Sequence, residues 1–333
     1  MQLYRCGSFG CWLLAATAAS STSTTTMVVL IGDSMSTGQG IHRVFADHPP
    51  DPVGNPAMGR DNNRTVLYEF GGGPNEFCWR DNVQTAAALV AAGLDETDDH
   101  HALVNLACAG AGMRGILMQW EYAKTELGSL EGATILLSFG ANEGLQLEGL
   151  NGGGLISLDT LSTCFQSVLP FTPVNTDDLT DWEELESRID DVFQTILSEA
   201  PASARIRVVG YPLQFRPIFD VVCFSLLAPC GRTFDALMSR MNTILRATTA
   251  RYQSGDAGSS IDLEFVDIED NSLLPEGVCS VSNRHIRDVV WDFSRFSDGF
   301  SFQALRSAFA GSTFHPTAEA HAAVAGRILE SLA

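Results

Sequence analysis

Five short stretches rich in apolar residues recur along the chain, and they cover residues 27–31, 102–106, 133–139, 205–210 and 261–267, with charged residues interspersed in the last two. The first of them, MVVLI, is continuous rather than alternating. A continuous run of this length is typical of a parallel strand that is covered on both faces of a sheet. The pattern therefore predicts five strands, and Gly32 ends the first of them.

Helical patterns fill the spaces between the runs, at 81–93, 113–127, 182–199, 233–252 and 316–332. Asp81 is expected to cap the first helix and Gly93 to end it, while Pro316 suits the first turn of the last. Strands that alternate with helices indicate an α/β fold, a three-layer sandwich around a central parallel sheet of about five strands. Because no repeat or linker divides the chain, we expect a single domain over 27–333.

Residues 1–26 have the pattern of a signal peptide followed by a polar leader. Arg5 precedes a short apolar run at 9–19, and that run is too short to span a bilayer. The alternative is an irregular cytosolic N-terminus. Of the eight cysteines, six lie beyond this segment; they are even in number and form no CxxC pair. This suits three disulfides better than zinc, and therefore export, although six cysteines allow 15 pairings.

The formal net charge is −20. Such a surface repels nucleic acid and anionic membranes, so we expect neither as a partner. No spacing of His, Cys and carboxylates suggests a metal site, and we expect no cofactor. The sequence leaves the oligomeric state open.

Four polar stretches follow a strand or precede a helix: 32–34, 109–110, 140–142 and 314–316. Loops at the carboxyl ends of parallel strands gather at one edge of the sheet. Together they contain what acyl transfer needs, which is a serine, a histidine base and donors for an oxyanion. Taken alone, Ser34 fits equally well as the cap of a following helix.

These four blocks, taken in order, resemble the SGNH (GDSL) hydrolase family. The matching residues are Ser34 in IGDSMSTGQG, Gly110 in NLACAGAG, Asn142 in SFGANE and His315 in GSTFHPTAEAH. The resemblance implies the flavodoxin-like SGNH fold, with Ser34 as nucleophile and His315 as base. It also implies an oxyanion hole made by the N–H groups of Ser34 and Gly110 and by the Asn142 amide.

Within that family the chain is most similar to secreted esterases and lipases of the actinobacterial type. Those proteins combine the GDS block with a C-x-R stretch (here Cys78-Trp79-Arg80), a cysteine just before the glycine block and an FHP motif. This likeness implies the pairs Cys78–Cys108 and Cys230–Cys279. Cys164–Cys223 then remains as the third pair.

Two positions depart from the family pattern. Glu143 follows Asn142 where relatives commonly have Asp, and Ser312 stands where many relatives place the Asp that orients the histidine. An imidazole needs only an acceptor for its Nδ1–H to hold the right tautomer. The main-chain carbonyl of Ser312 can serve, and nothing in the sequence favours Asp292 or Asp298 instead.

Two residues near these blocks receive structural roles. We expect Asp33 to hold the turn through hydrogen bonds, and His321 to pack within the last helix. The predicted function is a secreted esterase that hydrolyses small-molecule or lipid esters through a Ser34–His315 dyad, without stable insertion into a membrane. The alternatives are a lipase or phospholipase for long acyl chains and an inactive binding module on the same fold. Aromatic residues in the loops at 45–75 and 271–311 could line an acyl groove or cover the core.

Overall fold

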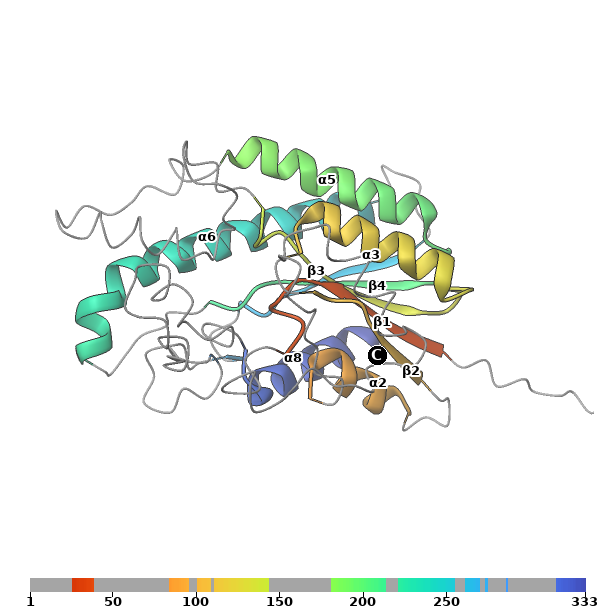
Figure 1. Cartoon of the computed structure of the whole chain (residues 1–333), viewed down its shortest axis with the longest axis horizontal. Helices are drawn as coiled ribbons and strands as arrows, with labels where there is room; N and C mark the ends of the chain where they lie inside the picture. The colour runs from red at the N-terminus through yellow and green to blue at the C-terminus, as the bar shows by residue number, and fades with distance from the viewer. Residues whose placement is uncertain are drawn as a thin grey trace, which may run out of the picture.

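The computed structural model describes residues 26–38, 84–95, 101–108, 111–143, 181–213, 221–254, 261–269, 273–274, 286 and 316–333. Its centre is one sheet of five parallel strands in the order β2-β1-β3-β4-β5 (Figure 1). The strands are β1 Thr26–Gly32, β2 His101–Asn105, β3 Thr134–Ser138, β4 Arg205–Val209 and β5 Asp262–Val266.

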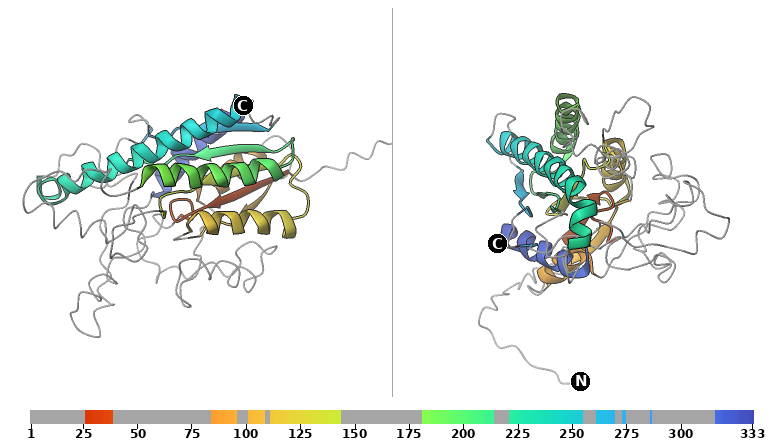
Figure 2. Two further views of the ribbon diagram at one scale, coloured as in Figure 1. Left: turned by 90° about the horizontal axis from the view of Figure 1, so that it is seen from above. Right: turned by 90° about the vertical axis from the view of Figure 1, so that its left-hand side faces the viewer.

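Helices cover both faces of this sheet (Figures 1 and 2). One face carries α3 Met113–Glu126, α5 Trp182–Glu199 and α6 Val221–Gln253, and the other carries α2 Ala86–Asp95 and α8 Ala318–Leu332. The predicted three-layer α/β architecture with five parallel strands is confirmed. Within the described part, no helix combines the length and apolar character that crossing a membrane requires.

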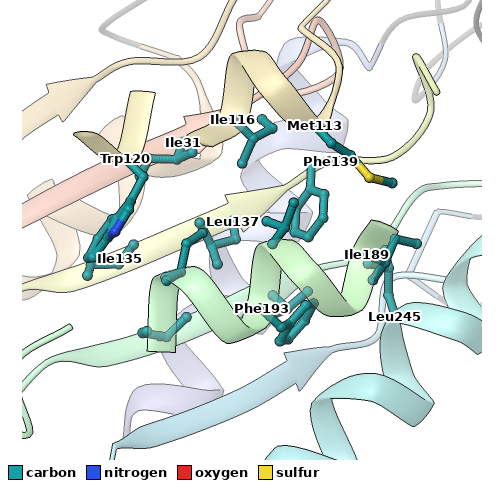
Figure 3. Packing of buried hydrophobic residues seen from close by; sticks show 14 of the residues in the cluster. Ile31, Met113, Ile116, Trp120, Ile135, Leu137, Phe139, Ile189, Phe193 and Leu245 are labelled. Atoms are coloured by element: carbon teal, nitrogen blue, oxygen red, sulfur yellow. The ribbon is translucent and has the colours of Figure 1, made fainter. Parts of the chain in front are cut away.

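Residues of β1 alternate between two hydrophobic cores. Val29 and Ile31 pack in the core beneath α3, α5 and α6, while Val28 and Leu30 pack in the core beneath α2 and α8. Figure 3 shows the first core, where Ile31 lies among side chains of β3, α3 and α5. Because both faces of the strand are buried, residues 27–31 are all apolar.

The first predicted helix is wrong at its end. The sequence places the end of the helix at Gly93, but α2 continues to Asp95. Gly93 serves packing instead, since a β-carbon there would lie 2.8 Å from Leu329 Cδ1 of α8. The predicted cap Asp81 lies outside the described residues, and the Thr85 hydroxyl accepts from the Ala88 N–H at 3.4 Å.

Two further helices begin elsewhere than predicted. α6 starts at Val221 rather than at Thr233. Pro229 and Gly231 lower the intrinsic helix propensity of this stretch, which is why its pattern does not reveal a helix. α8 starts at Ala318, and the Thr317 side chain caps it, so that Pro316 lies just before the cap.

Candidate active site

The order of the strands places Ser34 and Asn142 at a topological switch point of the sheet. From β1 the chain first forms β2 on one side of β1, and then continues on the other side with β3. Loops at the carboxyl ends of two such strands diverge and leave a crevice where ligands bind in open α/β sheets. Ser34 follows β1 and Asn142 follows β3, so both lie at the switch point between these two strands, and both residues are half-buried.

Gly32 ends β1 in a position that only glycine can fill. A β-carbon there would lie 2.7 Å from Ser36 Oγ and 3.0 Å from the Ser138 carbonyl oxygen. The Gln119 side chain of α3 holds the same residue from both sides: it accepts from the Gly32 N–H at 2.8 Å and donates to the Gly32 carbonyl at 3.0 Å. The backbone just before Ser34 is therefore fixed.

Asp33 holds the turn that carries Ser34, as expected from the sequence. Its side chain is fully buried. One carboxylate oxygen accepts from the Met35 N–H at 3.0 Å, and the other accepts from the Tyr211 hydroxyl at 2.7 Å. Burial raises the pKa of this carboxyl to about 6, against the lowering effect of these hydrogen bonds.

The first three sequence blocks meet through hydrogen bonds. The Cys108 N–H donates to the Gly32 carbonyl at 3.0 Å, which ties the second block to the first. The Asn142 amide donates to the Ala111 carbonyl at 3.2 Å, which ties the third block to the second. Gly110 itself lies outside the described residues.

Glu143 has a structural role at the start of α3. The N-cap of this helix is Gly112, which has no side chain to offer. The Glu143 carboxylate accepts from the Met113 N–H in its place, and it also forms an ion pair of 2.7 Å with Arg188 of α5. A carboxylate at a helix N-terminus is stabilised by the unsatisfied N–H groups there. Glu143 therefore ties the turn of Asn142 to two helices.

The fourth block is described only from Pro316 onward, so His315 and Ser312 lie outside the described residues. Pro316 is buried, and together with Met35 and Ser36 it lines a mostly apolar cavity between the sheet and α8. His321 is buried on α8, and its Nδ1 accepts from the Ala86 N–H at 3.4 Å. This agrees with the packing role expected for His321.

Two solved structures share the fold over nearly their whole length. They are an extracellular lipase from Streptomyces rimosus (TM-score 0.55, 16% identity, covering 92% of this chain and 100% of the lipase) and phospholipase A1 from Streptomyces albidoflavus NA297 (TM-score 0.52, 17% identity, covering 93% and 98%). The chain has the SGNH hydrolase fold. No protein-family model and no curated protein matches the sequence.

The six cysteines of the three predicted disulfides are described only in part. Cys108 is disulfide-bonded. Its predicted partner Cys78 lies outside the described residues, as do Cys164 and Cys279, while Cys223 and Cys230 belong to α6. The three pairings stay predictions. Among the described residues, no group of three His, Cys, Asp or Glu side chains is placed to hold a metal ion.

Two residues that support the candidate site were not predicted from the sequence. Tyr211 lies two residues beyond the end of β4 and thus at the same edge of the sheet as Ser34, a position that marks it as a candidate once the sheet is predicted. Gln119 carries no such signal. It lies in the second turn of α3, and its contact with Gly32 depends on how that helix packs on the sheet.

Proposed function

We propose that the protein is a secreted serine esterase in which Ser34 attacks the carbonyl carbon of a carboxylic ester. The observation that carries the proposal is that the described parts of the four blocks lie near the carboxyl ends of β1 and β3. Hydrogen bonds join the turns of Ser34 and Asn142, and the residue after His315 lines the same cavity as two residues that follow Ser34. Structures of the same fold are named as a lipase and a phospholipase A1.

In the proposed reaction, His315 Nε2 removes the proton from Ser34 Oγ as that oxygen attacks the ester. The N–H groups of Ser34 and Gly110 and the Asn142 amide stabilise the oxyanion of the tetrahedral intermediate. His315 then protonates the departing alcohol. Water attacks the acyl-enzyme with His315 as base, which releases the acid and restores Ser34.

The contacts of Asn142 support its role as an oxyanion donor. A primary amide has two N–H groups. One of them bonds to the Ala111 carbonyl, and this contact orients the amide plane. The second N–H can then serve a substrate oxygen without a change of rotamer.

We propose that the Ser312 carbonyl orients His315 by accepting its Nδ1–H. Because only the main chain is used, Ser312→Ala should keep kcat within a few-fold of the parent enzyme. A loss of several orders of magnitude would show instead that the hydroxyl is required.

Turnover of p-nitrophenyl acetate and butyrate tests the proposed function. The parent protein should hydrolyse both, and Ser34→Ala should lose on the order of 10⁴-fold or more in kcat, as nucleophile removal does in serine proteases. Ser198→Ala, a serine on the exposed side of α5, is the matched control and should behave like the parent. A Ser34→Ala variant that keeps full turnover would refute the assignment.

Acyl-chain preference separates an esterase from a lipase or phospholipase. The names of the two related structures justify the comparison. The measurement is kcat/KM on p-nitrophenyl esters from two to sixteen carbons. A maximum at short chains supports the esterase assignment, while a maximum at long chains supports the lipase.

We propose secretion on the basis of the segment 1–26. The protein produced in its own cells should be found in the medium without the apolar run at 9–19. An uncleaved N-terminus in the cell fraction would contradict this.

A further inference from the structure

A single buried hydroxyl links the turn of Ser34 to the turn of Asn142. The Tyr211 hydroxyl donates to Asp33 Oδ2 at 2.7 Å and accepts from the Ala141 N–H at 3.1 Å. Asp33 directly precedes Ser34, and Ala141 directly precedes Asn142. The two turns are thus connected through one atom.

The main chain of Tyr211 is itself held in place. Its N–H donates to the Asn242 side-chain oxygen at 2.7 Å, and its carbonyl accepts from the Asn242 amide at 2.8 Å. Asn242 belongs to α6 and is fully buried, as is Tyr211. A ring anchored in this way leaves its hydroxyl little freedom, so the hydroxyl can act as a fixed spacer.

We propose that Tyr211 is a positioning residue of the active site, whose hydroxyl sets the Ser34 turn and the Asn142 turn at the separation that the oxyanion hole needs. The inference rests on the proposed esterase function. It adds to the site a residue from the segment after β4, which none of the four sequence blocks contains. Misplacement of a reacting group by about 1 Å can cost on the order of 10²-fold in rate, so such a spacer has a measurable effect.

The direction of these hydrogen bonds is set by the main chain. The N–H groups of Ala141 and Met35 can only donate, so the hydroxyl proton of Tyr211 points to Asp33 and both carboxylate oxygens accept. The arrangement is complete when Asp33 is ionised. Removing the donation from Tyr211 should therefore raise the pKa of Asp33 further above its value of about 6.

The groups that face Asp33 are few. The Tyr211 hydroxyl from the end of β4 is the one titratable neighbour that contributes among the described residues, and the other donors are main-chain N–H groups. Glu269 joins more remotely, since its carboxylate accepts from the Asn242 amide at 3.3 Å. A change at the hydroxyl should thus act on Asp33 directly.

The test is Tyr211→Phe, which keeps the ring and removes the hydroxyl together with its hydrogen bonds to Asp33 and Ala141. On a short p-nitrophenyl ester we expect kcat to fall about 10- to 100-fold with KM within about twofold, and the acid limb of the kcat profile to move to higher pH. Tyr252→Phe is the matched control: this tyrosine stacks on Phe193, away from the site, and should behave like the parent.

A double-mutant cycle with Asn142→Ala separates positioning from a general structural effect. If Tyr211 acts through Asn142, Tyr211→Phe should cost less than about threefold in the Asn142→Ala background. An equal cost in both backgrounds would overturn the inference, as would an unchanged kcat or a loss explained by the unfolded fraction in a thermal melt.

The same experiment distinguishes the inference from the function beneath it. A parent protein that hydrolyses the ester, beside a Tyr211→Phe variant that matches it in kcat and pH profile, overturns the inference alone. A parent protein without any turnover, which also fails to react with a fluorophosphonate, overturns the proposed function and the inference together.

Discussion

Two buried charges in this molecule are held in opposite ways. Arg207 of β4 is 2% exposed, and it is paired with the Asp262 carboxylate through two bonds of 2.9 and 3.1 Å. It also donates to the Ser331 carbonyl at the end of α8 at 2.8 Å. Asp33 is buried just as fully, but its described partners are a hydroxyl and main-chain N–H groups.

The difference indicates what each charge is for. The Arg207 guanidinium, with an opposite charge beside it, links elements of the fold, here β4, β5 and α8. A buried carboxylate held only by neutral donors has a raised pKa and costs stability when it is ionised. Groups of the second kind gather at functional sites. Asp33 is next to the proposed nucleophile, whereas Arg207 lies on β4, the neighbour of the edge strand β5.

The largest effect among these variants should be the loss of kcat in Asn142→Ala. Asn142→Ala removes one oxyanion donor, so kcat should fall on the order of 10²–10³-fold while KM changes little. Steady-state kinetics on a short ester measure this. A rise in KM with an unchanged kcat would show that the Asn142 amide binds the substrate but does not stabilise the transition state.

The next effect is the dependence of stability on pH. The pKa of Asp33 is raised from 3.8 to about 6 by burial, so the folded state binds the proton more tightly than the unfolded state. The shift contributes about 3 kcal/mol to the free energy of unfolding. This contribution is complete below pH 3.8 and is lost as the pH rises through 6.

Urea unfolding of the parent protein and of Asp33→Asn at pH 4 and pH 7.5 measures this contribution. The advantage of the parent over the variant should shrink between the two pH values. A difference that is constant with pH would mean that the pKa of Asp33 is ordinary.

The smaller effect should come from the paired charge. Asp262→Ala leaves the Arg207 guanidinium with fewer acceptors, and we expect a loss of about 2 kcal/mol in the free energy of unfolding. The carboxylate of Glu264, 3.7 Å from Arg207, limits the loss. The kcat of the folded enzyme should stay unchanged, in contrast to Asn142→Ala.

Asp190→Ala is the control for Asp262→Ala. Asp190 pairs with Arg251 at 2.7 Å on the surface, where such pairs contribute about 0–1 kcal/mol. An equal loss in both variants would remove the contrast between the pair formed by the buried Arg207 and the surface pair.

The sheet was predictable because its signal is local. Each strand lies in a short stretch rich in apolar residues, and the apolar run in β1 is continuous because both of its faces are buried. The helix ends were less predictable, since Gly93 is a packing residue for α8 rather than the end of α2. That contact joins segments far apart in the chain, and no local pattern contains it.

The site divides in the same way. Ser34 and Asn142 follow strands, and their motifs mark them directly. The contribution of Tyr211 depends on β4 being placed beside β3, and that of Gln119 on the packing of α3. The role of Glu143 follows from Gly112 at the start of α3, which leaves the helix without a cap of its own.

The most direct test of the central claim is the reaction of the protein with a fluorophosphonate, followed by peptide mass spectrometry. Such a probe modifies a serine only where a base and oxyanion donors activate it. We expect one modified residue, Ser34, with slower modification in Asn142→Ala and none in Ser34→Ala. No modification, or modification of a different serine, would contradict it.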